Sequence, residues 1–150
     1  MIQFIHFRRA EKDDIPAIAA LLDGEHLPAD DIRPEEWIVA AHEKGNLVLG
    51  CGRIHVEAGV AELADLVVVQ EHRSEGIGRF LVQRIVEDHA ESICLVTRPQ
   101  DMGFFEGLGF RPVKAAAVPS WMHAKRKRLL GVLVESDLVF GLREANVVSF

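Results

Sequence analysis

The sequence predicts one α/β domain in which helices flank a mixed central β-sheet. Segments rich in β-branched and aromatic residues alternate with segments whose apolar residues recur at helical spacing. The chain has 150 residues, the length of one ordinary domain, and 49% of them are hydrophobic, enough for one core. No internal repeat, low-complexity segment or long linker divides it. We therefore expect a single domain over residues 1–150.

Local signals predict a strand and then a helix at the start of the chain. Residues 4–8 alternate and contain strong strand formers. Asp13 and Asp14 can cap a following helix, and Gly24 is a suitable stop. Residues 23–36 carry many carboxylates and predict an acidic loop or a poorly defined helix.

Three strands joined by tight turns are expected next, although residues 37–42 are ambiguous between helix and strand. The Gly45-Asn46 turn favours a hairpin into a strand over residues 47–56. The turn at residues 57–59 leads to a further strand over residues 60–69. The end of that strand is apolar on both faces, which predicts a central, covered strand.

The second half of the chain alternates helix and strand. A helix is expected from Gly76 to about Ala90, and a buried strand over residues 92–97. A short helix over residues 102–108 should lead into a final strand that begins at residues 110–113. The predicted order is β-α-β-β-β-α-β-α-β, which is typical of an α/β domain with a mixed sheet.

The tail beyond the last predicted strand combines charge and apolar residues. The basic run at residues 125–128 predicts a solvated helical face, with contact to a cofactor phosphate as the alternative. Residues 131–134 and 138–140 are apolar and must pack somewhere. Packing on the chain's own sheet and packing on a second subunit, as in a homodimer, are both open.

Composition excludes several classes of function. The net charge of −6 gives no electrostatic reason to bind nucleic acid. No apolar run is long enough to span a membrane, and Met1–His6 lacks the pattern of a signal peptide, so we expect a cytoplasmic protein. Cys51 and Cys94 form neither a disulfide framework nor a zinc pattern, so no metal is expected. The chain contains no tyrosine.

The loop before the helix at Gly76 is the most specific motif in the chain. It reads Arg73-Ser74-Glu75-Gly76-Ile77-Gly78 and joins a central strand to a helix. Its glycines allow a positive φ and leave several N–H groups at a helix N-terminus, where a pyrophosphate fits. A tight turn that uses glycine for packing alone is the alternative. The motif lacks the extra glycine of a dinucleotide fold and the Gly-Lys-Ser/Thr of a triphosphate loop.

Two blocks of sequence resemble a known family. Residues 66–78 resemble the acetyl-coenzyme A motif of the GNAT superfamily of N-acetyltransferases, in which Arg/Gln-x-x-Gly-x-Gly/Ala follows an apolar strand. Residues 104–110 resemble that family's short helix ending in Gly-Phe. The resemblance covers about residues 4–115 and leaves residues 116–150 as a C-terminal extension. It implies the GNAT fold and acetyl-coenzyme A as cosubstrate.

Three further segments are similar to the acetyltransferase domain of bacterial N-acetylglutamate synthases. They are residues 61–65, residues 95–98 and the tail from Pro119 to Arg128. This similarity implies a small-molecule amine as substrate, with an amino acid first and glutamate first among amino acids.

The resemblance also implies residues that hold the cosubstrate. The backbone of the loop would bind the pyrophosphate, and the end of the preceding strand would hold the pantetheine and polarise the thioester carbonyl. Phe105 lies on the short helix where many members have a tyrosine. The implied cofactor-binding residues are Val67, Val68, Arg73, Ser74, Glu75, Gly76, Ile77, Gly78 and Phe105.

The reaction needs a neutral amine, because an ammonium cannot attack a thioester. A free α-amine has a pKa near 8, so a modest base is enough. Glu62 matches an acidic residue that several members use as this base, often through water. Asp65 is the fallback, although in a regular strand it should point to the opposite face. A solvent-facing carboxylate with no catalytic role is the bland alternative for Glu62.

The thiolate must also leave, and the family's usual tyrosine acid is absent. A thiol with a pKa of about 8.5 leaves tolerably without a donor near neutral pH. Cys94 or a bound water could donate the proton instead. Arg53 and Arg98 could each hold a substrate carboxylate, and ordinary salt bridges are the alternative for each.

The sequence therefore predicts a single-domain, acetyl-coenzyme A-dependent N-acetyltransferase of a small amine. The alternatives are an acetyltransferase that detoxifies another small amine, and a catalytically silent acetyl-coenzyme A-binding module that regulates a partner.

Overall fold

A computed structural model describes residues 4–124 and 138–144 of the chain. Within these residues, seven strands form one mixed sheet in the order β1-β2-β3-β4-β5-β7-β6. The chain divides into two compact units, Met1–His55 with Leu63–His89, and Val56–Glu62 with Ala90–Phe150. Strand β4 contributes residues to both units.

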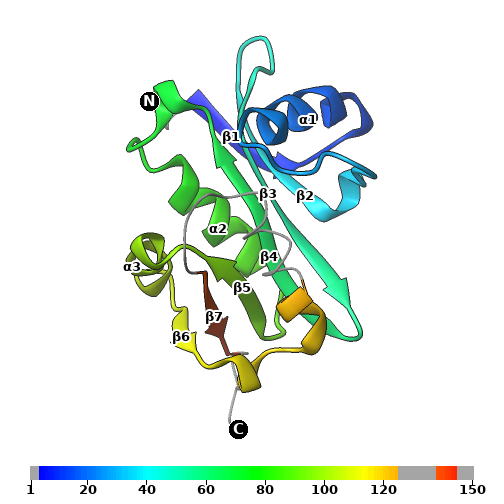
Figure 1. Cartoon of the computed structure of the whole chain (residues 1–150). Helices are drawn as coiled ribbons and strands as arrows, with labels where there is room; N and C mark the ends of the chain where they lie inside the picture. The colour runs from blue at the N-terminus through cyan, green and yellow to red at the C-terminus, as the bar shows by residue number, and fades with distance from the viewer. Residues whose placement is uncertain (1–3, 125–137, 145–150) are drawn as a thin grey trace, which may run out of the picture. The chain divides into compact units, whose positions relative to one another are not determined.

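The first unit contains the strands and helices of the N-terminal half (Figure 1). Strands β1 and β2 pair antiparallel, as do β2 and β3, and β3 leads through the Ala58-Gly59 turn into β4. The elements are β1 (Ile5–Arg9), α1 (Ile15–Gly24), β2 (Trp37–His42), β3 (Val48–Glu57), β4 (Val60–Val68) and α2 (Ile77–Glu87). The ambiguous residues 37–42 are a strand, and both predicted hairpin turns have positive φ, at Gly45-Asn46 and at Ala58-Gly59.

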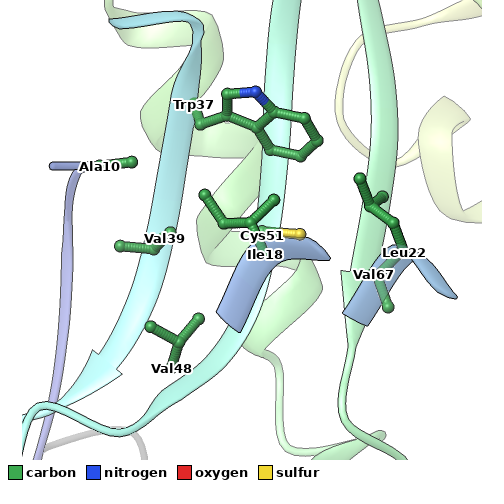
Figure 2. Packing of buried hydrophobic residues seen from close by; sticks show 8 residues of the cluster. All are labelled: Ala10, Ile18, Leu22, Trp37, Val39, Val48, Cys51 and Val67. Atoms are coloured by element: carbon green, nitrogen blue, oxygen red, sulfur yellow. The ribbon is translucent and has the colours of Figure 1, made fainter. Parts of the chain in front are cut away.

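The helices of the first unit cover opposite faces of these strands. Ile18 and Leu22 of α1 pack in the cluster shown in Figure 2, together with apolar residues of the strands. That cluster consists of Ala10, Ile18, Leu22, Trp37, Val39, Val48, Cys51 and Val67. Gly52 faces the other way, because a Cβ there would lie 3.0 Å from Ile85 of α2. Both faces of β3 are therefore covered.

The second unit contains the start of β4, the C-terminal strands and α3. Strand β5 (Ile93–Thr97) pairs parallel with β4 and antiparallel with β7 (Val139–Arg143), which also pairs with β6 (Arg111–Val113). The short helix α3 (Met102–Glu106) precedes β6. A separate core cluster consists of Cys94, Val118, Met122 and Phe140.

The expectation that residues 110–113 begin the final strand is wrong. Within the described residues the last strand is β7, which lies between β5 and β6 and packs Phe140 into the core of the second unit. Residues 138–140 therefore pack on the chain's own sheet. The basic run at residues 125–128 and the apolar residues 131–134 lie outside the described residues.

The turn Lys12–Asp14 just before α1 is held by a partly buried ion pair, which gives a first prediction. Asp14 is 4% exposed, and its carboxylate accepts hydrogen bonds from both terminal nitrogens of Arg8, at 2.7 and 3.0 Å, and from the Glu11 N–H at 2.7 Å. The hydrogen bond from Arg8 lowers the pKa of Asp14 below its usual range. The stabilisation is therefore complete above the unfolded-state pKa of about 3.9 and is lost as pH falls through the lowered folded-state pKa.

We expect Asp14→Asn to lower the free energy of unfolding by about 1–3 kcal/mol at pH 7, since it removes charge-assisted hydrogen bonds. Urea unfolding at pH 7 and at pH 3 checks this, and the difference between variant and wild type should shrink at the lower pH. The control is Asp13→Asn, because Asp13 is exposed and the charge change is the same. An equal loss for Asp14→Asn at both pH values would contradict this role.

Candidate functional site

The loop that joins β4 to α2 has the backbone shape predicted from its glycines. Gly76 has φ 88° and is the N-cap of α2, and Ser74 before it has φ 72°. The first N–H groups of a helix have no partner within the helix and attract anions. The first turn of α2 contains no acidic residue, and no side chain caps it. This helix start therefore suits a pyrophosphate, as the motif predicts.

The charged side chains of this loop bind one another and the neighbouring backbone. Arg73 donates from Nε to the Val68 carbonyl at 3.0 Å and forms an ion pair with Glu25 just after α1. His72 lies 2.8 Å from Glu75, and this hydrogen bond lowers the pKa of Glu75. Arg73 therefore links the loop to the end of β4, and its own N–H donates to the Gln70 carbonyl at 3.2 Å.

Strand β4 leads into this loop and is irregular in its middle. Asp65 has φ 55°, in the left-handed region, which costs a non-glycine residue about 1–2 kcal/mol. The assumption of a regular strand, used to place Asp65 opposite Glu62, therefore does not hold at this residue. Val67 is buried and Val68 half-buried, and the Val69 N–H donates to the Leu49 carbonyl of β3 at 2.8 Å.

The thiol of Cys51 lies beneath the irregular part of β4. It donates to the Asp65 carbonyl at 3.9 Å and interacts with the Val67 backbone. Burial, followed by the charge of Asp65, raises the pKa of Cys51 to about 12. The Val69 N–H donates to the Leu49 carbonyl of β3, and because successive amides of an extended strand point to opposite edges, the Val68 amide is expected to point away from β3. Val68 is thus the better placed of the two valines to donate to a bound thioester.

Arg53 on β3 is engaged by two carboxylates. Its Nε donates to Asp65 at 2.8 Å, and a terminal nitrogen lies 3.7 Å from Glu36. Its guanidinium carbon lies 5.6 Å from the ring centroid of Trp37, the residue opposite it on β2. Glu36 also lies 3.3 Å from a ring nitrogen of His55. Arg53 was predicted either to hold a substrate carboxylate or to form ordinary salt bridges. This geometry agrees with the salt bridges.

Glu62, the predicted base, lies in the second unit. It is 2% exposed, unlike the usual strand carboxylate that faces solvent. It lies directly opposite Cys94 of β5 in the parallel register. Burial, followed by the negative charge of Glu62, raises the pKa of Cys94. The structure therefore brings the predicted base close to the thiol that was considered as a proton donor.

Phe105 and Arg98 also belong to the second unit. Phe105 is buried on α3, with edge-on contacts to Phe104 and Phe110 at centroid distances of 5.0 and 5.9 Å. It provides an aromatic surface without a hydroxyl. Arg98 is exposed, and its Nε donates to Asp101 at 2.8 Å. The roles of both residues stay predictions.

Sequence reasoning did not identify the contacts between β3 and β4 that support Asp65. A usable signal exists, because Asp65 interrupts an apolar strand and Arg53 and Cys51 share one face of the preceding strand.

Among the described residues, no group of three or more His, Cys, Asp or Glu is placed to hold a metal ion. In the same part of the chain, no helix has the length and apolar character needed to cross a membrane.

Comparisons with known proteins identify the family. A model described as an acetyltransferase (GNAT) domain matches residues 33–112. An uncharacterised N-acetyltransferase of Chlorobaculum tepidum is 28% identical over 83 residues, which cover 53% of this chain and 52% of that protein. The chain thus spans about half the length of this curated relative.

Solved structures share the fold. N-acetylglutamate synthase of Neisseria gonorrhoeae, complexed with coenzyme A and N-acetyl-glutamate, has a TM-score of 0.74 and 22% identity, covering 96% of this chain and 36% of that chain. Rv2747 of Mycobacterium tuberculosis, complexed with CoA and NLQ, has a TM-score of 0.72 and 22% identity, covering 93% and 98%. The predicted GNAT fold is confirmed. Because the family model covers more than half of the chain, this protein belongs to the GNAT acetyltransferase domain family.

Proposed function

We propose that this protein transfers the acetyl group of acetyl-coenzyme A to the amine of a small molecule, with an amino acid, glutamate first, as the leading acceptor. The observation that supports this most directly is the start of α2, where left-handed Gly76 opens a helix with no acidic residue in its first turn. That helix start would bind the pyrophosphate of the cosubstrate through amides of the Arg73–Gly78 loop, of which the Arg73 N–H already donates to the Gln70 carbonyl.

The proposed reaction assigns roles to four of the residues described above. Glu62 accepts the ammonium proton, directly or through water, and the neutral nitrogen forms a bond to the thioester carbon. The Val68 amide stabilises the negative charge that develops on the carbonyl oxygen, and Val67 helps to hold the pantetheine. The carbon–sulfur bond then breaks, the nitrogen loses its second surplus proton as the amide forms, and the departing thiolate takes up that proton or one from a nearby donor. The proximity of the Cys94 thiol to Glu62 supports Cys94 as one source of that proton.

The acceptor is the less defined half of the proposal. The Neisseria gonorrhoeae synthase complexed with N-acetyl-glutamate supports an amino acid. The engagement of Arg53 by Asp65 and Glu36 instead favours a second candidate, an amine without a carboxylate, because the guanidinium is already neutralised. In both cases Arg98 could contact the acceptor. The cytoplasmic location and the homodimer stay predictions from the sequence.

Thiol release from acetyl-coenzyme A, measured with a panel of amines, tests the proposal. The panel should contain glutamate, other amino acids, and amines that lack a carboxylate. We expect release that depends on the amine and exceeds the rate without it. Selective release with glutamate supports the leading acceptor, and release only with amines lacking a carboxylate supports the second candidate. Tight binding of acetyl-coenzyme A with no turnover on any amine would instead indicate a silent binding module.

A further inference from the structure

We propose that Arg53 and Asp65 form a positioning pair that holds β4 in its irregular shape and thereby directs the Val68 amide toward the thioester carbonyl. The inference deepens the proposed function and rests on it. It assigns to Arg53 a role through the backbone of β4 rather than direct contact with the acceptor.

The first step concerns the backbone of Asp65. Its φ of 55° lies in the left-handed region, where a residue with a Cβ is strained and only glycine, asparagine and aspartate are tolerated well. A strand residue in this conformation changes the direction of the amides that follow it. The orientation of the Val68 amide therefore depends on keeping Asp65 in this conformation.

The second step concerns the contact that holds Asp65. Arg53 Nε donates to its carboxylate at 2.8 Å, and the two side chains are only 23% and 14% exposed. Such a charge-assisted bond is screened less by solvent than a surface pair. Arg53 itself is oriented by Glu36 at 3.7 Å and by the Trp37 ring. The guanidinium is thus held on three sides and anchors the Asp65 side chain.

The third step concerns the backbone on either side of Asp65. Cys51, two residues before Arg53 and on the same face of β3, donates to the Asp65 carbonyl. The bond from the Val69 N–H to Leu49 then ties β4 to β3 again. Three alternate residues of β3 therefore contact this stretch of the chain. Arg53 contacts the Asp65 side chain, Cys51 the Asp65 carbonyl and Leu49 the Val69 N–H.

Asp65→Gly and Asp65→Ala form a matched test, because both remove the carboxylate and only glycine adopts a positive φ without strain. We expect Asp65→Gly to keep kcat within about threefold of wild type and Asp65→Ala to lower it about tenfold or more, with the KM for acetyl-coenzyme A less affected. Asp65→Asn should resemble glycine more than alanine. Thermal unfolding checks that each variant is folded.

A spectroscopic readout follows the same variants without an acceptor. The infrared carbonyl stretch of bound acetyl-coenzyme A, isolated with a ¹³C-labelled acetyl group, reports hydrogen bonding to the thioester. We expect a shift to lower frequency in wild type and in Asp65→Gly, and a smaller shift in Asp65→Ala. A wild type that fails to bind acetyl-coenzyme A would remove the proposed function itself. Normal binding with equal shifts in both variants would remove only the positioning pair.

Arg53→Met, made in wild type and in Asp65→Gly, separates positioning from acceptor binding. If Arg53 acts through Asp65, the substitution should lower kcat about tenfold in wild type and less than about twofold once residue 65 is glycine. If Arg53 holds an acceptor carboxylate, it should raise the KM for that acceptor equally in both backgrounds, and this result would overturn the proposal. Equal activity losses in Asp65→Gly and Asp65→Ala would also overturn it, since they would show that the left-handed backbone conformation at residue 65 is not what activity depends on.

Discussion

Gly78→Glu should weaken the binding of acetyl-coenzyme A by at least about 100-fold while the protein stays folded. Gly78 is the second residue of α2, and the amides around it are those proposed to bind the pyrophosphate. A glutamate there adds bulk and a negative charge at the point where an anion must approach. Each tenfold increase in the dissociation constant corresponds to a loss of about 1.4 kcal/mol of binding free energy. Calorimetric titration of acetyl-coenzyme A into wild type and variant measures the effect.

The folded state should tolerate this substitution, because an acidic side chain in the first turn of a helix is favourable to the helix dipole. Gly78→Gln is the matched control, since it has the same bulk without the charge. We expect Gly78→Gln to bind more tightly than Gly78→Glu, with both weaker than wild type. Cofactor affinity unchanged in Gly78→Glu would show that the pyrophosphate binds elsewhere and would remove the main support for the proposed function.

Most elements of the fold could be predicted because their signals are local. Gly45, Asn46 and Gly59 are residue types that accept positive φ, and the structure has positive φ at each. The helix that starts after Gly76 has both a turn signal and an amphipathic pattern. Only its end was misplaced, at about Ala90 instead of Glu87.

Strand β7 could not be predicted because its reasons are not local. Gly141 in its centre weakens any strand pattern read from sequence. Its partner β5 explains the glycine, since a Cβ at residue 141 would lie 2.9 Å from the Leu95 side chain and 3.2 Å from that of Met102. The strand therefore depends on packing between segments far apart in the chain.

The candidate site was predictable as residues but not as geometry. The resemblance selected Glu62 and the loop from Arg73, and the structure shows that Glu62 is buried. The left-handed backbone of Asp65 has no signal in the sequence, because aspartate adopts it only where neighbouring contacts hold it. The sequence likewise does not show that Arg53 pairs with Asp65. It therefore leaves open that Arg53 holds the carboxylate of the acceptor, although its charge is engaged within the protein.

Glu62→Gln should lower the rate of acetyl transfer by about 10²–10⁴ at neutral pH and leave the affinity for acetyl-coenzyme A nearly unchanged. The amide keeps the shape of the carboxylate and removes the base that accepts the ammonium proton. Glu57→Gln is the control, since it makes the same change at an exposed position of β3. A Glu62→Gln variant as active as wild type at neutral pH would exclude Glu62 as the base.

The pH–rate profile of thiol release extends this test to the missing acid. The loss in Glu62→Gln should shrink as pH rises, because an α-amine with a pKa near 8 increasingly loses its proton to bulk solvent. With no tyrosine to deprotonate, the wild-type rate should climb to a plateau without a fall near pH 10.

A fall at high pH would instead identify a proton donor, and Cys94 is the first candidate. The pKa of Cys94 is raised by burial and then by the charge of Glu62. The high-pH limb, meaning the fall of the rate at high pH, should therefore lie above the usual thiol pKa of about 8.5. Glu62→Gln removes the second cause and should move that limb to lower pH. Cys94→Ala should abolish the limb if the thiol is the donor, whereas a limb that survives in Cys94→Ala would assign the proton to another group.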